Sequence, residues 1–125
     1  MSNPRTKNGN ERRKLRAWLR AQGRPCWICR AFGRPGDIDY SLPPGHPYEF
    51  EVDELVPVSR FAEGGYSSPT ACSLDRRNVD ATHRCCNEWR GNKSVDAVLA
   101  IAKGESPSTV APATLSVLGV TSRAW

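Results

Sequence analysis

The sequence lacks any long apolar segment. No apolar run approaches the roughly 18 residues that a membrane-spanning helix needs, and the Arg-rich N-terminus has no apolar stretch of the kind found in secretory signals. We therefore expect no membrane partner and a cytoplasmic location.

Hydrophobic residues are also scarce, because they make up 38% of the 125 residues. That share supports one small domain but not a large core, and no internal repeat extends it. We expect a disordered basic arm over residues 1–10, a single domain over residues 11–104 and a flexible tail over residues 105–125. Another source of stability should therefore supplement the core.

The cysteines do not form an even set, since there are five of them. The tight spacing of Cys26-x-x-Cys29, in a chain without a secretory signal, favours reduced thiols on a metal over a disulfide framework. Two further thiolate or imidazole ligands are needed to complete a tetrahedral zinc site.

The candidates for these two ligands are Cys72, His83, Cys85 and Cys86. His83 and Cys86 are three residues apart, so at the start of a helix they share one face. The predicted ligands of a structural zinc are Cys26, Cys29, His83 and Cys86. Cys72 and Cys85 remain as spare thiols, and the alternative is that all five are buried hydrophobic cysteines.

Positive charge is concentrated at the start of the chain. Residues 1–24 hold eight Lys or Arg and one acidic residue, a net charge of +7, whereas the other 101 residues hold ten basic and twelve acidic groups. A basic arm on a nearly neutral domain is typical of proteins that bind a phosphate backbone, and a solubilising tail is the alternative interpretation.

Hydrophobic periodicity and turn residues give a coarse secondary structure. Leu15, Trp18 and Leu19 predict an amphipathic helix over residues 11–22, which Gly23 ends. Ser94 is the expected N-cap of a helix that ends at Gly104. The other expected elements are a metal knuckle over 25–29, a loop over 33–47, a strand over 50–58, a long surface loop over 59–77, a short strand over 78–81 and a helix from 82 or 83 to 91.

These elements carry Asp53-Glu54, Asn78 and His83-x-x-Cys86-Asn87, and in this order they resemble the ββα-metal core of HNH endonucleases. The resemblance covers roughly residues 25–93. It implies an α+β fold, in which a small ββα-metal core with a structural zinc is flanked by an N-terminal and a C-terminal helix. It also implies a hydrolase, a metal-dependent endonuclease that nicks or cuts double-stranded DNA.

The resemblance assigns a role to each polar residue of the motif. Asp53 and Asn87 would hold a catalytic Mg²⁺ or Mn²⁺, and Asn78 would fasten the loop through side-chain hydrogen bonds. A carboxylate and an amide oxygen suit such a hard cation. The predicted catalytic residues are Glu54, Asp53 and Asn78.

Glu54 departs from the family pattern, which has a histidine as general base at this position. A glutamate is ionised at neutral pH and can accept a proton from water. Strand alternation sends Asp53 and Glu54 to opposite faces, so both reach one site only if the strand ends or twists there. The alternatives are that Glu54 is a further metal ligand, or that the core binds DNA without cleaving it.

The role of His83 has a second interpretation. In HNH proteins without zinc the last histidine of the motif binds the catalytic ion, so Asp53 and His83 would hold it here. That interpretation leaves Cys26-x-x-Cys29 without a role.

The expected partner is double-stranded DNA, with backbone phosphates contacted by Arg60, Arg84, Arg90 and Lys93. The main alternative function is a catalytically inactive, zinc-stabilised DNA-binding module, and a zinc-dependent protein-interaction domain is a third. The resemblance to small bacteriophage and bacterial proteins suggests a larger partner such as a packaging complex. The sequence does not choose among packaging, restriction and mobile-element transfer, and it does not set sequence specificity or oligomeric state.

Overall fold

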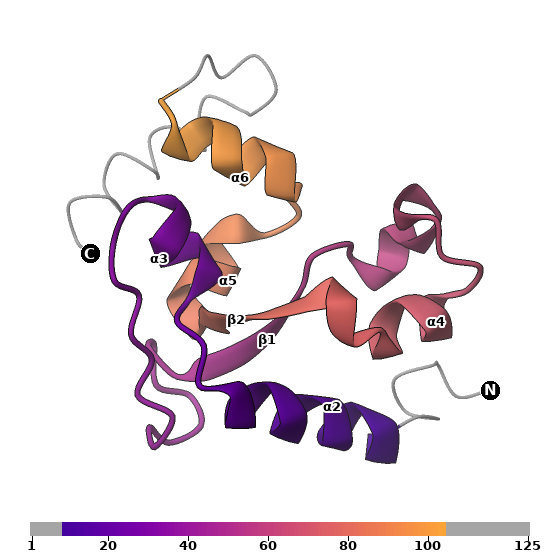
Figure 1. Cartoon of the computed structure of the whole chain (residues 1–125), viewed down its shortest axis with the longest axis horizontal. Helices are drawn as coiled ribbons and strands as arrows, with labels where there is room; N and C mark the ends of the chain where they lie inside the picture. The colour runs from indigo at the N-terminus through magenta and orange to yellow at the C-terminus, as the bar shows by residue number, and fades with distance from the viewer. Residues whose placement is uncertain (1–8, 105–125) are drawn as a thin grey trace.

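A computed structural model describes residues 9–104 of the chain (Figure 1). Its elements, in chain order, are α2 (Gly9–Gln22), α3 (Trp27–Ala31), β1 (Phe50–Glu54), η1 (Val58–Gly64), α4 (Pro69–Leu74), η2 (Arg76–Asn78), β2 (Val79–His83), α5 (Arg84–Arg90) and α6 (Val95–Ala102). Apart from residues 9 and 10, the predicted arm and the predicted tail lie outside the described residues.

The two strands form one antiparallel sheet, in which Phe50 is opposite His83 and Asp53 is opposite Asp80. Figure 1 shows this hairpin between α2 on one side and α3, α5 and α6 on the other. The described chain is therefore a small α+β fold, the class that the sequence predicted. None of its helices is long and apolar enough to cross a membrane.

The helix α2 covers one face of the hairpin. It begins two residues before the predicted start and ends at Gln22. The chain leaves the helix at Gly23, whose φ of +63° suits glycine. Leu15 and Leu19 are its buried residues, as their spacing predicts. They form a core cluster with Phe50, Val79 and Ala81 of the two strands.

A second cluster lies on the other side of the hairpin. Its buried members are Ile28 and three of the five cysteines, and Trp89 and Phe32 pack against it with their rings at 5.7 Å in an edge-to-face arrangement. The helix α6 contacts α3 and buries Val98 and Ile101. Much of the second core is thus built from cysteine rather than from large apolar side chains.

The segment between the strands is more ordered than the sequence analysis predicted. The strand expected over 50–58 ends at Glu54, and the loop expected over 59–77 contains η1, α4 and η2. The helix α4 begins where Ser68 Oγ accepts a hydrogen bond from Ala71 N at 3.0 Å, with Pro69 in the first turn. Within the expected loop, Ser68 and Pro69 are thus an N-cap followed by a proline.

The later elements lie close to their predicted positions. The strand β2 ends at His83, two residues beyond the expected boundary, and α5 starts at the next residue. Ser94 caps α6 as predicted, since its Oγ accepts from Ala97 N at 3.0 Å. The short connection between β2 and α5 places two of the predicted zinc ligands at one junction.

Candidate metal centre and the neighbouring acidic face

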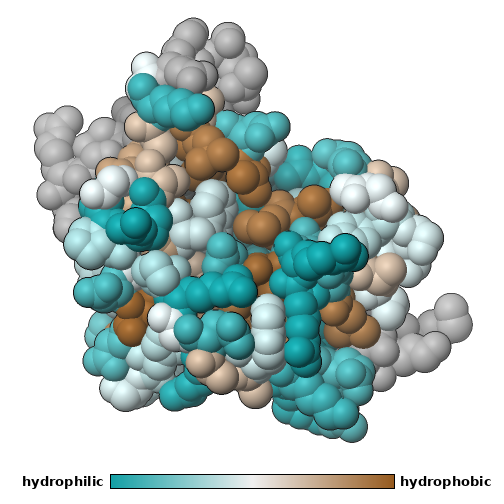
Figure 2. All heavy atoms as spheres, in the orientation of Figure 1, coloured by the Kyte–Doolittle hydropathy of each residue, from teal (hydrophilic) through white to brown (hydrophobic). Residues whose placement is uncertain are grey.

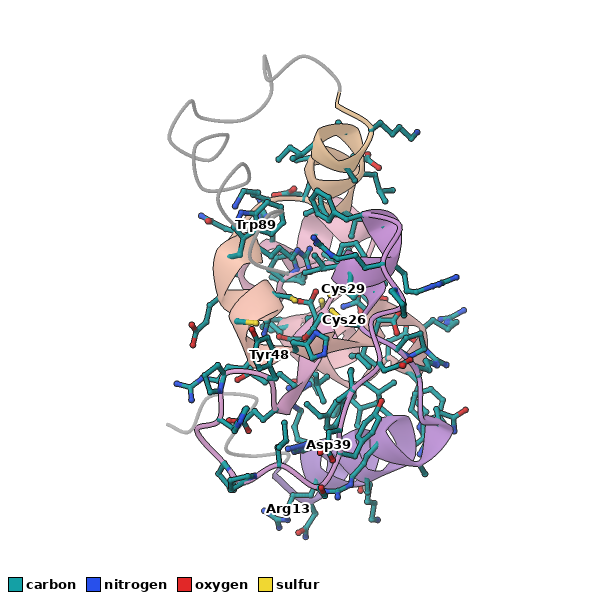
Figure 3. The ribbon with its side chains drawn as sticks, turned by 90° about the vertical axis from the view of Figure 1, so that its left-hand side faces the viewer. Arg13, Cys26, Cys29, Asp39, Tyr48 and Trp89 are labelled. Carbon is teal, nitrogen blue, oxygen red and sulfur yellow. The ribbon has the colours of Figure 1, made fainter. Side chains whose placement is uncertain are left out.

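The four predicted zinc ligands come together in one buried group. Their ligand atoms all lie within 4.8 Å of one another, and each residue is less than a tenth exposed. Figure 3 shows the labelled pair, Cys26 and Cys29, inside the fold between α3 and the strands. The group consists of Cys26 and Cys29 from α3 and its N-cap, His83 from the end of β2, and Cys86 from α5.

The distances within this group suit a tetrahedral zinc ion. Cys29 Sγ lies 3.8 Å from Cys86 Sγ, and each of these sulfurs lies 3.6 Å from His83 Nδ1. Zinc bonds of about 2.3 Å to sulfur and about 2.0 Å to nitrogen, at tetrahedral angles, imply sulfur–sulfur and sulfur–nitrogen separations of about 3.8 and 3.5 Å. The group could therefore hold a structural metal such as zinc.

The orientation of the His83 ring is fixed by a contact outside the group. His83 Nε2 lies 2.9 Å from the carbonyl oxygen of Asp37. A carbonyl can only accept, so Nε2 carries the hydrogen and donates it, which leaves Nδ1 toward the sulfurs. Contacts of this kind commonly orient the histidine ligands of metals.

A tight turn supports the other pair of ligands. Cys26 N donates to Gly36 O at 2.8 Å, and Gly36 has a φ of +71°. A Cβ at Gly36 would meet Cys26 O at 2.9 Å and the Cβ of Cys29 at 3.0 Å. Only glycine allows the chain to pass this close to the cysteine pair.

The electrostatics of the group favour a cation at its centre. Hydrogen bonds with Cys26 and Cys29 raise the pKa of His83 to about 10. Hydrogen bonds from Cys29 and Cys86 lower the pKa of Cys26, because the sulfurs share protons. Burial raises the pKa of Cys86. The lowered pKa of Cys26 thus favours a thiolate in a buried place, and a metal ion would compensate its charge.

The remaining cysteines stand apart from the group. Cys72 Sγ donates to Val56 O at 3.3 Å near the segment between the strands, and burial raises its pKa. Cys85 precedes Cys86 but does not belong to the group of four. Burial raises its pKa as well. Both residues are the spare thiols that the sequence predicted.

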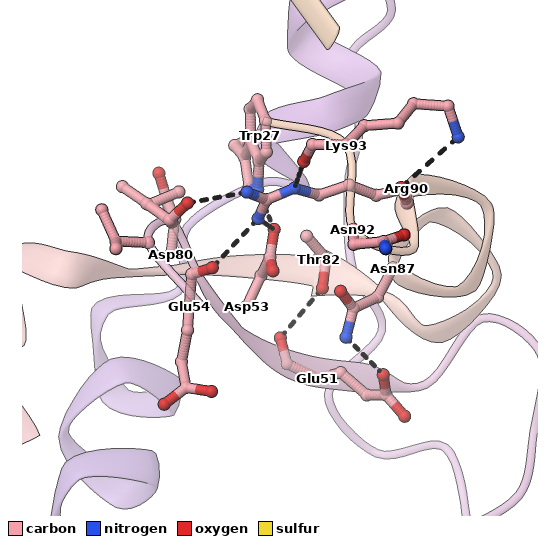
Figure 4. Close-up of polar contacts among 12 residues, drawn as sticks. Trp27, Glu51, Asp53, Glu54, Asp80, Thr82, Asn87, Arg90, Asn92 and Lys93 are labelled. Carbon is pink, nitrogen blue, oxygen red and sulfur yellow. Dashed lines mark hydrogen bonds and ion pairs between the residues drawn. The ribbon is translucent and has the colours of Figure 1, made fainter. Parts of the chain in front are cut away.

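A second feature lies next to the metal group, on the side of β1 that faces α5. Asp53 is 5% exposed, and its Oδ2 accepts from both Trp27 Nε1 and Arg90 Nη1 at 2.7 Å (Figure 4). Burial raises the pKa of Asp53, and the Arg90 guanidinium acts in the opposite direction. The carboxylate on this face is therefore paired within the protein.

Arg90 holds this side of the hairpin together. The residue is 2% exposed, and besides Asp53 its guanidinium donates to the carbonyl oxygens of Glu54, Leu55 and Lys93 at 2.7 to 3.1 Å. A guanidinium enclosed in this way cannot reach a DNA phosphate. We predicted Arg90 as a DNA contact, and the structure corrects that role to a structural one.

Asn87 makes its contact with a different carboxylate from the predicted one. Its Nδ2 donates to Glu51 Oε1 at 2.9 Å (Figure 4). The backbone carbonyl oxygen of Glu51 also accepts a hydrogen bond from Thr82 Oγ1 at 3.2 Å. Glu51 and Asp53 are two residues apart on β1, so both face α5. The sequence analysis missed Glu51, although its alternation with Asp53 along a strand was a usable signal.

Glu54 lies on the opposite face. Figure 4 shows its side chain directed away from Asp53, and its Oε2 lies 3.5 Å from Arg12 Nη1 of α2. The predicted convergence of Asp53 and Glu54 on one site is therefore absent from the structure, because β1 pairs with β2 in unbroken register up to Glu54.

Asn78 lies in the segment between the strands and is 3% exposed. Its Oδ1 accepts from Val56 N at 2.8 Å, and its Nδ2 donates to Val56 O at 3.0 Å and to Cys72 O at 3.2 Å. These bonds tie the chain after β1 to the chain before β2. Such contacts are structural, the role that the family resemblance implied.

The other predicted DNA contacts are engaged within the protein. Arg60 donates to Asn92 O at 2.9 Å, Arg84 pairs with Glu88 at 3.0 Å, and Lys93 Nζ donates to Trp89 O at 2.6 Å. Burial lowers the pKa of Lys93.

No protein-family model, curated protein or solved structure matches the chain.

Proposed function

We propose that this chain is a metal-dependent endonuclease with a ββα-metal core, acting on double-stranded DNA. The observation that carries the proposal is a single face of the hairpin, next to the metal group, on which Glu51, Asp53 and Asn87 place two carboxylates and an amide. Oxygen donors of this type suit Mg²⁺ or Mn²⁺.

The zinc site has a supporting role in this proposal. Cys86 is one of the four candidate zinc ligands and Asn87 is the next residue of α5, so a bound zinc would fix the start of the helix that presents the amide. Small domains with little apolar core commonly gain their stability in this way. The position of Asn87 against β1 is thus coupled to the zinc.

The residues of the face fit a catalytic divalent ion. Glu51 accepts the N–H of Asn87, so the amide oxygen is the atom left for a cation, and Asp53 is the second donor of the set. Asp53 would exchange its contact with Arg90 for the cation. A bound ion would supply positive charge to stabilise the phosphate as its P–O bond breaks.

The proton acceptor in this proposal is Glu51 rather than the predicted Glu54. Glu51 is partly exposed and lies 2.9 Å from Asn87, whereas Glu54 is on the other face of β1. A carboxylate within hydrogen-bond reach can take a proton from the attacking water, and general bases commonly contribute about 10²-fold or more.

A specific observation favours a second candidate, a zinc-stabilised module that binds DNA without cleaving it. Asp53 is enclosed by Arg90 and Trp27, and this arrangement needs no divalent ion. Under that alternative Asp53 has only a structural role.

Plasmid cleavage by the zinc-loaded full chain distinguishes the two candidates. We expect nicking or linearisation in Mg²⁺ or Mn²⁺, none in EDTA, and at least about a 10²-fold loss in Glu51→Gln and Asp53→Asn. Asp53→Asn keeps an acceptor for Trp27, and circular dichroism would check its fold. Salt-sensitive DNA binding without cleavage in any divalent ion would favour the binding module.

A further inference from the structure

A pocket of about 370 Å³ lies between α2 and the chain at β1. The α2 side is basic and carries three arginines, and the β1 side carries two glutamates and Phe50. The residues that the argument uses are Arg12, Arg13, Arg16, Glu49, Phe50 and Glu51. The sequence analysis associated the basic charge of residues 1–24 with a phosphate backbone but named no individual contact in this pocket.

Two of these arginines, Arg13 and Arg16, are exposed. Among residues 9–104 no carboxylate lies within ion-pair distance of Arg13 or Arg16. The Arg16 guanidinium stacks over the Phe50 ring at 4.7 Å, and Arg13 donates to Asn10 Oδ1. Stacking holds the Arg16 side chain at the pocket while its N–H groups stay available.

The acidic wall of the pocket does not cancel this charge. Glu49 Oε2 lies 3.7 Å from Arg84 Nη1, and Arg84 also pairs with Glu88 at 3.0 Å. Arg12 is held in place because it donates to Ser73 O at 2.7 Å. Three arginines and two glutamates line the pocket, so its lining carries one surplus positive charge, and a concave site with positive charge attracts anions.

The pocket is also next to the proposed catalytic face. Glu51 lines the pocket and accepts the hydrogen bond from Asn87, so one residue belongs to both features. In Figure 2 hydrophilic side chains cover the lower right of the molecule, where α2 begins in Figure 1. Figure 3 shows Arg13 on α2, far from the labelled cysteines.

We propose that this pocket binds a backbone phosphate of duplex DNA, with Arg13 and Arg16 as the phosphate contacts, and that it directs the strand toward Glu51. The inference rests on the proposed function for the identity of the substrate. Guanidinium groups match the geometry of a phosphate and bind it in a bidentate way. Each contact also releases counterions, which makes the binding dependent on salt.

The test measures the affinity of the zinc-loaded full chain for a labelled duplex between about 50 and 200 mM salt. Arg13→Gln/Arg16→Gln should lower the slope of log K against log salt by about 1.8, since each lost contact accounts for about 0.9. The control is Arg30→Gln/Lys103→Gln, which removes the same charge from two exposed residues outside the pocket. Arg13→Lys/Arg16→Lys retains the charge and should keep most of the slope.

The outcomes separate this inference from the proposed function. Equal slopes in the pocket variant and the control, with wild-type cleavage intact, would overturn the phosphate pocket and leave the nuclease standing. A loss of slope confined to the pocket variant, in a protein that cleaves nothing, would support the pocket and refute the nuclease. Loss of slope in the lysine variant together with loss of ellipticity would show that Arg16 acts in folding, and the inference would fail.

Discussion

Asp53 and Arg90 form an ion pair of 2.7 Å in which both side chains are almost completely buried. The pair joins β1 to the last residue of α5. It thus binds the predicted metal ligand Asp53 to the predicted DNA contact Arg90. Two charges in such a place are tolerated only because each is hydrogen-bonded on several sides.

Removal of the cation from this pair should destabilise the fold strongly. We expect Arg90→Ala to lower the free energy of unfolding by about 3–5 kcal/mol, because it leaves the Asp53 carboxylate buried without its partner. Urea unfolding of the zinc-loaded protein measures the change. The exposed Arg30→Ala is the matched control and should stay within about 0.5 kcal/mol of the wild type. Similar values for the two variants would contradict the structural role of Arg90.

The two adjacent cysteines of α5 should differ in their effect on metal content. Cys86→Ser removes a ligand from the group of four, and we expect it to abolish binding of one zinc per chain and to unfold the protein. Cys85→Ser should keep the zinc. Elemental analysis and circular dichroism check both variants, and treatment with a chelator should reproduce the Cys86→Ser state. Full zinc content in Cys86→Ser would refute the ligand set.

Substitutions at two glycines near the cysteines test whether the turn at Gly36 supports zinc binding. Gly36→Ala should weaken zinc retention, because the new Cβ would meet Cys26 O at 2.9 Å and has no room to shift. Gly33→Ala is the control, since Gly33 has a similar φ of +78° but open space around its Cβ position. Competition with a chromophoric chelator compares the two. If Gly33→Ala loses zinc equally, the loss comes from backbone strain at a positive φ and not from the contact between the new Cβ and Cys26 O.

The Tyr66 phenol should lose its proton at an unusually high pH. Burial and a 2.7 Å hydrogen bond to Asp75 raise its pKa to about 12, against an ordinary value of about 10. The raised pKa stabilises the fold fully below pH about 10, and this contribution is lost as pH rises through about 12. Burial raises the pKa of Tyr40 as well, so the comparison is made in a Tyr40→Phe background. In that background phenolate absorbance should show a late step that disappears in Tyr66→Phe and remains in Tyr48→Phe. A late step that persists without Tyr66 would contradict this assignment.

Substitutions at the two glutamates of β1 distinguish the predicted general base, Glu54, from the proposed one, Glu51. We expect Glu51→Gln to reduce the rate of plasmid cleavage by about 10²-fold or more and Glu54→Gln to leave it within a few-fold of the wild type. DNA affinity, measured in parallel, should change little in either variant. The reverse pattern would return the role to Glu54 and would require a rearrangement of β1 on binding DNA.

Local spacing predicted those parts of the site that lie close in the chain. Cys26 and Cys29 are one i, i+3 pair, and His83 and Cys86 are the other, so the sequence alone identified both halves of the metal group. The buried face of α2 followed in the same way from Leu15 and Leu19. The Ser68 cap of α4 was readable in principle, but the surrounding Gly and Ser residues concealed it.

From the sequence alone came the class of fold, the four residues that could hold a metal and the helices with clear caps, because these depend on neighbours within one or two turns. What only the tertiary structure decided was the set of partners across the hairpin. Arg90 reaches Asp53 over 37 positions and Asn87 reaches Glu51 over 36. Which carboxylate each side chain meets depends on how α5 packs on β1, and local periodicity carries no information about that packing.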